Sequence, residues 1–280
     1  MKKISRRSFL AAAGLSVAAL ALTACGGSSS SVASSVASSA AASSEAASTS
    51  AAAGELTTVE AGKLTMATNA AFPPYEMTTD AGEFEGIDIE TAQAIADKLG
   101  LELQIDDMDF DAALLSVQQG KADIVMAGVT VTDERKAVMD FSDSYATGIQ
   151  SIIVPEGSDI TSPDDLAGKK IGTQRGTTGY IYCSDDFGDE NVVAYDDGLT
   201  AVQALNNGQV DAVVIDNAPA QEFIAANPGL KILDTSYAEE DYAIGMAKGS
   251  SLEDAVNAAL EELKADGTLQ SIVDKYITAE

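Results

Sequence analysis

Apolar residues from about residue 56 onward recur in two alternating patterns along the chain. Short apolar runs such as 63–68 and 123–127 have the length of buried β-strands. Between these runs, as in 87–99, apolar residues return every three or four positions, which is typical of one face of a helix. Gly100 follows that stripe and indicates a helix that ends in a left-handed residue. The alternation predicts an α/β fold made of strand–helix–strand units.

The same alternation of strands and helices restarts after Pro155. Strands are expected at 63–68, 101–105, 123–127, 170–173, 192–194, 211–215, 231–233 and 242–246, and helices at 87–99, 110–119, from 177, 199–206, 219–226, 252–264 and 269–276. We expect two lobes with open parallel sheets, lobe 1 from residues 56–148 and 243–280 and lobe 2 from residues 149–242. The chain is expected to cross between the lobes near 148–152 and 238–243. In sheets of this kind, a ligand binds beyond the carboxyl ends of the strands.

The first 55 residues show the composition of an export signal and a tether. Basic residues at 2, 3, 6 and 7 precede an apolar run at 9–22 that is short for a bilayer span, which predicts a signal peptide over 1–24. Leu22-Thr-Ala-Cys25 has the pattern of a lipoprotein signal, so Cys25 is expected to be the lipid anchor on the extracytoplasmic face of the cell membrane. The Ser/Ala-rich segment 25–55 is predicted to be a disordered tether.

The charge and the missing residue types exclude several classes of function. The formal net charge is −28, so nucleic acid is not an expected partner. The chain has no histidine, which removes Ser-His-Asp and Cys-His catalysis and the usual zinc sites. It has no glycine-rich nucleotide motif and no pair of cysteines at metal spacing, and Cys183 is expected to be structural. We therefore expect no cofactor and no metal.

The segment Met126-Ala-Gly-Val-Thr-Val-Thr-Asp-Glu-Arg135 runs from a buried strand onto a loop of small and hydroxyl residues. Thr132-Asp-Glu indicates a helix start. The Arg135 guanidinium offers five donors in a planar fork that binds a carboxylate bidentately. This segment therefore predicts a pocket for a small carboxylate. The alternative is a solvated helix arginine that pairs with Asp133 or Asp140.

Aromatic side chains follow two of the strands. Asn69 and Phe72 follow the first strand, in a loop that Pro73 and Pro74 stiffen, and Phe110 begins the second helix. Two rings from separate loops would sandwich a ligand side chain. The alternatives are core packing for Phe72 and a hydrophobic staple at the helix start for Phe110.

The second lobe offers a seat for an anion and a carboxylate. The loop 172–179 leads from a strand into a helix, where backbone N–H groups and hydroxyls at Gly176, Thr177 and Thr178 are suited to an anion. Asp216 follows an apolar strand, so its carboxylate is expected at the carboxyl end of the sheet. The alternatives are helix capping by threonine and by Asp216. Together with the arginine, these groups describe a receptacle for a zwitterion.

In this order and spacing, the residues resemble the extracytoplasmic solute-binding proteins (family 3) of polar amino-acid ABC transporters, and the resemblance covers the whole chain. Residues 86–90 are similar to the family signature, although Thr91 stands where an apolar residue is usual, and 127–135 followed by 140–143 are very similar to glutamine-binding members. The resemblance implies a two-lobed type II periplasmic-binding-protein fold with a two-stranded hinge. It also implies a non-enzymatic, monomeric protein that captures a free L-amino acid by lobe closure and delivers it to an ABC permease.

The resemblance also assigns roles to site residues. Arg135, with Gly128, Thr130 and Thr178, would hold the ligand α-carboxylate, and Asp216 would hold the α-ammonium. Phe72 and Phe110 would hold the side chain. The expected ligand-binding residues are Asn69, Phe72, Phe110, Gly128, Thr130, Arg135, Gln174, Thr177, Thr178 and Asp216.

Asn69 stands where basic-amino-acid and glutamine-binding relatives have aspartate, so a cationic ligand side chain would lack its countercharge. Asn69 and Gln174 instead suit a neutral polar side chain, because a buried polar site rejects ligands that leave it unpaired. Glutamine is the first expectation, and cystine and glutamate follow. Two other classes stay open: an enzyme similar to a dehydratase that acts on a cyclic carboxylate, with Asp216 as its acid, and a sensory module.

Overall fold

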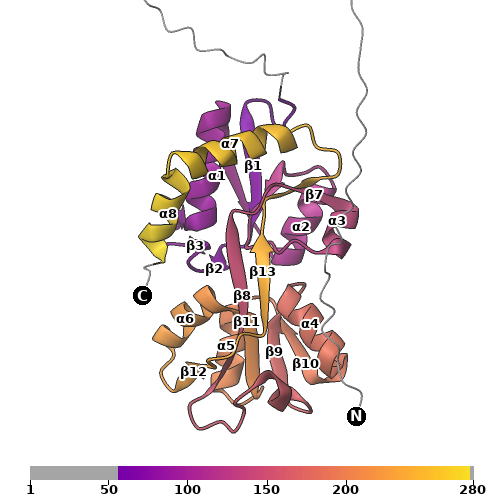
Figure 1. Ribbon diagram of the computed structural model, residues 1–280, viewed down its shortest axis with the longest axis vertical. Coiled ribbons are helices and arrows are strands. Elements are labelled where there is room, and N and C mark those ends of the chain that lie inside the picture. Colours follow the sequence, from indigo (N-terminus) through magenta and orange to yellow (C-terminus); the bar gives the residue numbers. More distant parts are fainter. Residues whose placement is uncertain (1–55, 278–280) are drawn as a thin grey trace, which may run out of the picture. The chain divides into compact units, whose positions relative to one another are not determined.

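The computed structural model describes residues 56–277. The predicted signal peptide (1–24), the anchor residue Cys25 and the tether (25–55) lie outside the described residues. In the described part, no helix combines the length and the apolar character that a membrane span requires. Two sheets organise this part of the chain, and helices cover both faces of each (Figure 1). We call the part around the first sheet lobe 1 and the part around the second sheet lobe 2.

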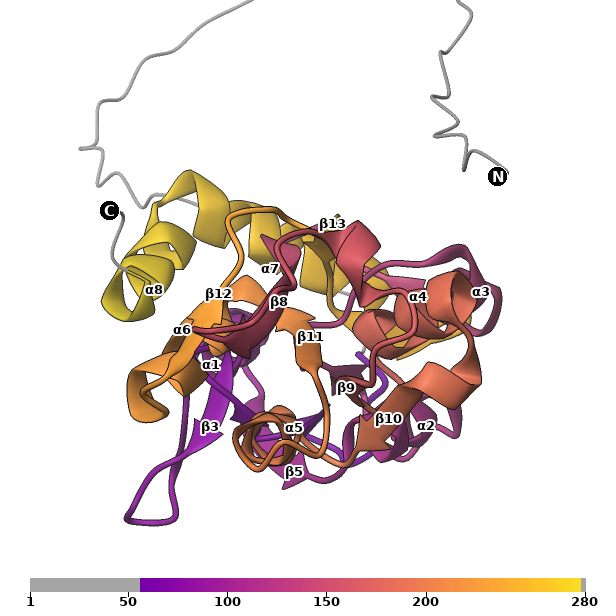
Figure 2. The same ribbon diagram turned by 90° about the horizontal axis from the view of Figure 1, so that it is seen from below.

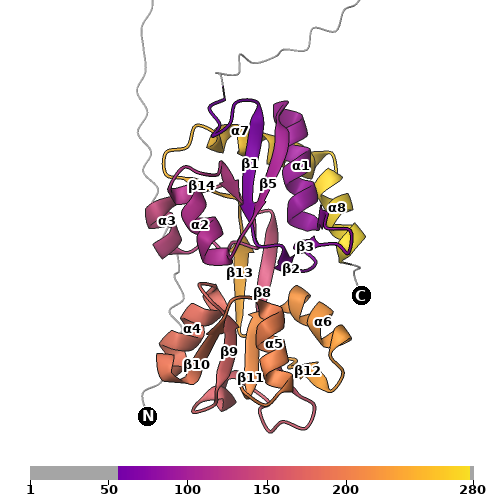
Figure 3. The ribbon, with the colours of Figure 1, turned by 180° about the vertical axis from the view of Figure 1, so that it is seen from behind.

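The sheet of lobe 1 has the strand order β5-β1-β6-β14-β7. Its strands are β1 (Lys63–Thr68), β5 (Glu102–Asp107), β6 (Ile124–Val125), β7 (Met139–Phe141) and β14 (Gly245–Ala247). One face carries α1 (Ile87–Leu99), α7 (Glu253–Ala265) and α8 (Thr268–Tyr276), and the other carries α2 (Phe110–Gln118) and α3 (Asp133–Val138) (Figure 3). β1 is parallel to β5 and β6, whereas β14 is antiparallel to β6 and β7.

A small antiparallel sheet lies between β1 and α1 in the chain. It consists of β2 (Ala71–Phe72), β3 (Glu76–Thr78) and β4 (Phe84–Glu85). The hydrophobic pattern did not predict it, because strands of two or three residues are too short to show a period. This sheet places Phe72 and Glu76 at the site described below.

The sheet of lobe 2 has the strand order β10-β9-β11-β8-β12, and β13 also pairs with β8. Its strands are β8 (Ala146–Pro155), β9 (Ile171–Gln174), β10 (Val192–Tyr195), β11 (Ala212–Asp216), β12 (Leu230–Ile232) and β13 (Ala238–Tyr242). Its helices are α4 (Thr178–Phe187), α5 (Gly198–Asn206) and α6 (Asn217–Ala226), with 3-10 turns η1 (Pro163–Leu166) and η2 (Asp189–Asn191). α4 packs on one hydrophobic cluster with Cys183, and α5 and α6 pack on another.

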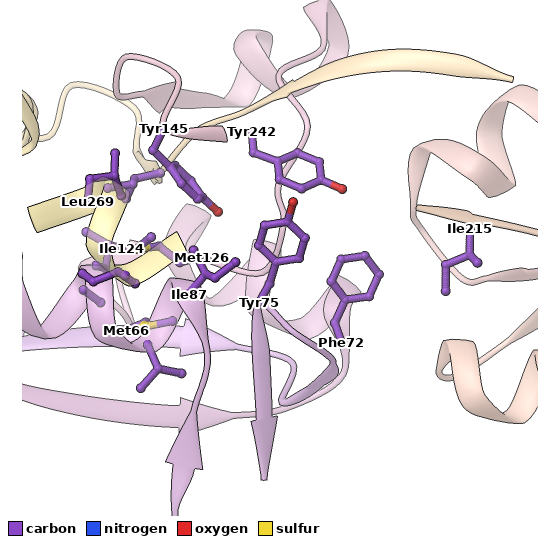
Figure 4. Packing of buried hydrophobic residues seen from close by; sticks show 14 of the residues in the cluster. Met66, Phe72, Tyr75, Ile87, Ile124, Met126, Tyr145, Ile215, Tyr242 and Leu269 are labelled. Carbon is purple, nitrogen blue, oxygen red and sulfur yellow. The ribbon is translucent and has the colours of Figure 1, made fainter. Parts of the chain in front are cut away.

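The core of lobe 1 packs α1, α7 and α8 against the sheet. Met66, Ile87, Ile124 and Leu269 lie together in this cluster (Figure 4). Three aromatic residues, Phe72, Tyr75 and Tyr242, lie at the edge of the cluster that faces lobe 2, where Tyr75 and Tyr242 meet edge to face at 5.2 Å between ring centroids (Figure 4). The same apolar core therefore stabilises lobe 1 and supports the surface that lobe 2 faces.

Two strands, β8 and β13, connect the lobes and run side by side (Figures 1 and 2). Their pairing extends from Ala238 opposite Gln150 to Tyr242 opposite Ala146. Beyond β13, the Ala243 amide donates to the Val129 carbonyl of lobe 1 at 3.1 Å. The chain therefore forms the two-stranded hinge of a type II binding fold.

Most expected elements are present, but strand directions and the bounds of two strands differ. The α1 bounds, 87–99, are as predicted, and Gly100 ends the helix with φ 69°. The expectation of wholly parallel sheets is wrong, because β8, β13 and β14 return antiparallel to their neighbours. The expected strand 123–127 shortens to β6, and the expected strand 242–246 is interrupted after Tyr242, where the chain leaves the hinge and enters the sheet of lobe 1.

Candidate ligand-binding site

A small cavity lies where the carboxyl ends of strands from both lobes meet. All ten residues expected from the sequence line this cavity, together with Glu76 and Ala127. The lining residues are Asn69, Phe72, Glu76, Phe110, Ala127, Gly128, Thr130, Arg135, Gln174, Thr177, Thr178 and Asp216. The topology thus brings together side chains from loops that are up to about 150 positions apart in the sequence.

Arg135 is buried and is the only basic side chain among the described residues that line the cavity. The Thr132 hydroxyl accepts from the Arg135 amide and caps α3. Nη1 donates to the Thr130 carbonyl at 2.7 Å, and Nη2 donates to the Gly176 carbonyl of lobe 2 at 3.1 Å. The guanidinium carbon lies 5.3 Å from the ring centroid of Phe110, a distance suited to a cation–π interaction. The donors that these bonds leave free are available to an anion in the cavity.

The alternative role for Arg135, a solvated helix arginine, is wrong. Only 8% of Arg135 is exposed, and burial lowers the pKa of its guanidinium, an effect that the nearby Glu240 opposes. Within residues 56–277, Arg135 forms no ion pair with Asp133 or Asp140, and Asp140 pairs with Lys248 at 2.6 Å. A buried cation without a carboxylate partner is an electrostatic cost, which an anionic ligand would offset.

Two amide side chains meet across the lobes. Nε2 of Gln174, at the end of β9, donates to Oδ1 of Asn69 at 2.8 Å. The Asn69 amide nitrogen donates to the Met108 carbonyl at 3.0 Å. Both amides are buried, so this end of the cavity offers neutral hydrogen-bonding groups.

The two phenylalanines both line the cavity. Phe72 belongs to the core of lobe 1 as well, so its core packing and its position at the cavity are compatible. Phe110 is the first residue of α2 and belongs to a second cluster on the other face of the sheet. Rings from separate elements therefore border the same space.

The two neighbouring threonines of lobe 2 behave differently. The Thr177 hydroxyl donates to the Gln174 carbonyl at 2.8 Å and accepts from the Tyr180 amide at 3.4 Å, which is the capping role considered as its alternative. Thr178 is buried, and its Oγ1 lies 3.4 Å from Oγ1 of Thr130 in lobe 1. Thr178 is therefore the hydroxyl of this pair that faces the opposite lobe.

Asp216 ends β11 and stands at the N-cap position of α6, yet its side chain makes no capping hydrogen bond. Its carboxylate accepts from the Tyr242 hydroxyl and, at 2.8 Å, from Nε2 of Gln150. Burial raises the pKa of Asp216 to about 7, although these two donors oppose the shift. The capping role is therefore wrong, and the carboxylate is directed to the cavity and the hinge instead.

Gly128 lies on the loop after β6 with φ 54°, in the left-handed region. Its amide donates to Oδ2 of the buried Asp88 at 3.0 Å, and a Cβ here would lie 2.9 Å from the Phe72 ring. Burial raises the pKa of Asp88 to about 6, and the Gly128 amide opposes this shift. Glycine is required here because the loop approaches the aromatic ring in a left-handed conformation.

Sequence reasoning missed four polar residues at or beside the site: Glu76, Gln150, Glu240 and Tyr242. One signal for Glu240 was available, because β13 reads Ala-Glu-Glu-Asp-Tyr and the period of two places Glu240 on the same face as Tyr242. For Glu76, which lines the cavity, the local sequence gives no comparable signal.

The site is arranged for binding a dipolar molecule. A guanidinium and the N-terminus of α4 can hold an anion, and Asp216 can hold a cation. In the part of the chain that is described, no group of three or more acidic or cysteine side chains is placed to hold a metal ion. Two α/β lobes, two hinge strands and one buried polar cavity between the lobes define a two-lobed ligand-binding protein.

Comparison with known proteins agrees with that class. The model of the bacterial extracellular solute-binding proteins, family 3, matches residues 64–279, and the chain belongs to this family. The L-cystine-binding protein TcyJ of Escherichia coli is 33% identical over 226 residues, which cover 79% of this chain and 85% of TcyJ.

Solved structures show the same similarity. The arginine-, lysine-, histidine-binding protein ArtJ from Geobacillus stearothermophilus has a TM-score of 0.75 and 34% identity, with coverage of 78% of this chain and 96% of ArtJ. An ancestral arginine-binding protein bound to glutamine has a TM-score of 0.74 and 42% identity, with coverage of 78% and 99%.

Proposed function

We propose that this protein captures a free L-amino acid between its lobes and delivers it to an ABC permease. The observation that carries the proposal is the buried pairing of opposite chemistries across one cavity, with Arg135 for a carboxylate and Asp216 for an ammonium group. The relatives are named as amino-acid-binding proteins rather than enzymes, which supports a binding role. The ten expected residues are proposed as the ligand contacts.

We propose a neutral polar amino acid, with glutamine first, as the ligand. The amides of Asn69 and Gln174 supply donors and acceptors without charge, and Phe72 and Phe110 border the space beside them. A ligand amide would replace the bond between these two side chains with one bond to each lobe. Cystine and glutamate are the next candidates in this class.

A cationic amino acid is a second candidate because of Glu76. This side chain lines the cavity and is fully buried beside the buried Asp88, and no basic side chain of the described residues is bonded to it. Burial raises the pKa of Glu76 well above its usual value, and the nearby Asp88 adds to this shift. A guanidinium beside Glu76 would offset the cost of ionising it.

We propose that the two lobes meet at the boundaries 148/149 and 242/243. We also propose that their closure depends on ligand contacts to both lobes. Arg135 to Gly176 and Gln174 to Asn69 are hydrogen bonds between lobes. A ligand that bonds to groups on both sides has a higher affinity for the closed form and shifts the population toward it.

Thermal shift measurements on refolded protein test the proposed function. The protein is unfolded in denaturant, dialysed and refolded to remove bound ligand, and its melting temperature is measured with each of the twenty amino acids and with cystine. Glutamine is expected to give the largest rise, because a ligand that binds the native state stabilises it by mass action. A largest rise with arginine would favour the second candidate, and no rise with any amino acid would refute the proposed function.

We also propose that the protein is a monomer held at the extracytoplasmic face of the membrane by lipid on Cys25. Full-length protein expressed in a bacterium is expected to incorporate labelled fatty acid, and Cys25→Ser is expected to abolish the label and release the protein. Label that persists in Cys25→Ser would exclude this residue as the anchor.

A further inference from the structure

Glu240 is a buried carboxylate in hinge strand β13, beside the proposed site but not among the residues that line the cavity. Only 6% of the residue is exposed. Its neighbours Glu239 and Asp241 in the same strand are exposed, so burial of charge is specific to this position. An ionisable residue buried in a hinge needs partners, and three elements supply them.

Three donors converge on one oxygen of this carboxylate. Oε2 of Glu240 accepts from Oγ1 of Thr130 in lobe 1 at 3.2 Å and from Oγ1 of Thr178 in lobe 2 at 3.0 Å. Nε2 of Gln150 in β8 donates to the same oxygen at 3.0 Å and to Oδ2 of Asp216 at 2.8 Å. Glu240 is thus joined to both lobes and, through one amide nitrogen, to Asp216.

The number of protons decides what the threonines offer to a ligand. A hydroxyl has one proton and two lone pairs, whereas a carboxylate oxygen can only accept. Thr130 and Thr178 therefore both direct their proton to Glu240. Each hydroxyl that lines the cavity then presents lone pairs to it, and neither can donate to a ligand carboxylate.

We propose that Glu240 is a positioning residue that makes the Thr130 and Thr178 hydroxyls acceptors and thereby makes the site selective for a protonated, unsubstituted α-amino group. This inference rests on the proposed function. The three acceptors, Asp216 and the two hydroxyls, match the three N–H donors of a primary ammonium group. The α-carboxylate is then held by Arg135 and by backbone N–H groups at the start of α4, without the threonine hydroxyls.

The consequence for recognition is that the ammonium group bridges the lobes, because Thr130 belongs to lobe 1 and Thr178 and Asp216 belong to lobe 2. A ligand without this group leaves the remaining lone pairs of these three acceptors without a donor and supplies no positive charge beside Asp216, which a buried polar site penalises. A hinge residue with a purely structural role would affect all ligands alike. Selectivity for the α-amino group separates the two roles.

The test compares two ligand pairs by titration calorimetry on refolded protein. One pair is L-glutamine and glutaramate, which is glutamine without its α-amino group, and the other is L-arginine and 5-guanidinopentanoate, its counterpart. Glu240→Leu removes the acceptor and keeps an apolar side chain of similar size, so the two hydroxyl protons turn to other acceptors, the ligand among them. We take the amino acid that binds the wild type and compare its affinity with that of its des-amino partner. In the variant, this ratio of affinities is expected to fall at least tenfold, mainly because the amino acid binds more weakly.

Glu239→Leu is the matched control, since it makes the same change at an exposed position of the same strand. It is expected to keep the wild-type preference. An equal loss of affinity for both members of a pair in Glu240→Leu, or an unchanged preference, would overturn the inference. If the wild type binds neither L-glutamine nor L-arginine, the proposed ligands are wrong. This outcome is seen with the wild type alone, so it is distinguishable from a failure of the inference about Glu240.

A second pair of variants applies if Glu240→Leu does not fold, which its unfolding curve shows. Thr178→Val removes the hydroxyl and keeps the shape of the side chain, whereas Thr178→Ser keeps the hydroxyl. The preference for the amino acid over its des-amino partner is expected to fall at least tenfold in Thr178→Val and to persist in Thr178→Ser. A preference that persists in Thr178→Val would refute the inference.

Discussion

The Tyr242 hydroxyl donates a hydrogen bond to the Asp216 carboxylate, so the acidic residue of lobe 2 is tied to the hinge strand β13. The ring of Tyr242 also packs against Gly148 of β8, where there is no room for a Cβ atom. Site and hinge are therefore one packed unit. A change in the hinge strands is expected to reach the binding residues through Tyr242.

Gly148→Ala is expected to destabilise the protein by about 1 to 3 kcal/mol, because the new methyl group would overlap the fully buried ring of Tyr242. Gly157→Ala is the control, since a Cβ at Gly157 meets nothing within 4 Å. Its free energy of unfolding is expected to change by less than about 0.5 kcal/mol. Urea unfolding of the three proteins checks both values, and a Gly148→Ala protein as stable as wild type would show that the ring can move aside.

The stability of the ligand-free protein is expected to depend on pH through Asp216. Burial raises the pKa of Asp216 to about 7, so between about pH 4 and pH 7 the native state holds a proton that the unfolded chain has released. The contribution of Asp216 to the free energy of unfolding therefore falls as pH rises through this window, by up to about 1.4 kcal/mol per unit. Above pH 7 the contribution of Asp216 to the free energy of unfolding no longer changes with pH and stays low.

Asp216→Asn removes this titration, so the stability difference between wild type and variant is expected to decline from pH 5 to pH 7. Denaturant unfolding at each pH measures it. Asp88, whose pKa burial raises to about 6, shifts stability in the same direction but is present in both proteins. A stability difference that is flat from pH 5 to pH 8 would contradict the assignment to Asp216.

Arg135→Ala is expected to weaken ligand binding by about 2 to 5 kcal/mol, because the ligand carboxylate loses its charged partner in a buried site. Arg135→Lys is expected to lie between wild type and alanine, since lysine keeps the charge but lacks the planar fork that now reaches both lobes. Titration calorimetry with the ligand found by thermal shift measures these values.

Arg175→Ala is the control for Arg135. Arg175 is an exposed arginine of lobe 2, in the loop between β9 and α4, and it pairs with the exposed Asp196 at 3.5 Å. An exposed pair of this kind contributes little, so the variant is expected to bind as the wild type does. Equal losses in Arg135→Ala and Arg175→Ala would point to a general effect of charge and not to a contact.

The regular elements could be predicted from the sequence because long amphipathic stripes carry their own signal. The apolar stripe of α1 and the left-handed Gly100 fix that helix. The ends of the strands then identified Asn69, Arg135 and Asp216 as neighbours at one edge of the sheets, and the structure brings them to one cavity. The mixed direction of the sheets was missed, because apolar runs do not reveal strand orientation.

Glu240 could not be identified in the same way, since its burial depends on partners that are distant in the sequence. Thr130 is 110 positions away, Gln150 is 90 and Thr178 is 62. In a chain with 44 acidic residues, most carboxylates are expected to be solvated. The period of two in β13 places Glu240 on the same face as Tyr242, but only the tertiary structure shows which partners its carboxylate has there.

Asn69→Asp is expected to shift the ligand preference toward cationic amino acids. Oδ1 of Asn69 accepts from Gln174, and the amide nitrogen donates to the Met108 carbonyl at 3.0 Å. Aspartate keeps the first bond but turns an oxygen toward that carbonyl, so the buried charge lacks a partner unless the ligand supplies a cation. L-glutamine is expected to bind at least tenfold more weakly, and L-arginine and L-lysine are expected to bind more tightly than to the wild type.

Asn69→Ala removes the amide without adding charge. It is expected to weaken the binding of L-glutamine without making L-arginine the preferred ligand. Competition between L-glutamine and L-arginine, measured by calorimetry for the three proteins, gives the preference directly. If Asn69→Asp leaves that preference unchanged, position 69 does not contact the ligand side chain. The specificity would then have to come from other lining residues, and Glu76 is the carboxyl group on the lobe 1 side of the cavity that could supply it.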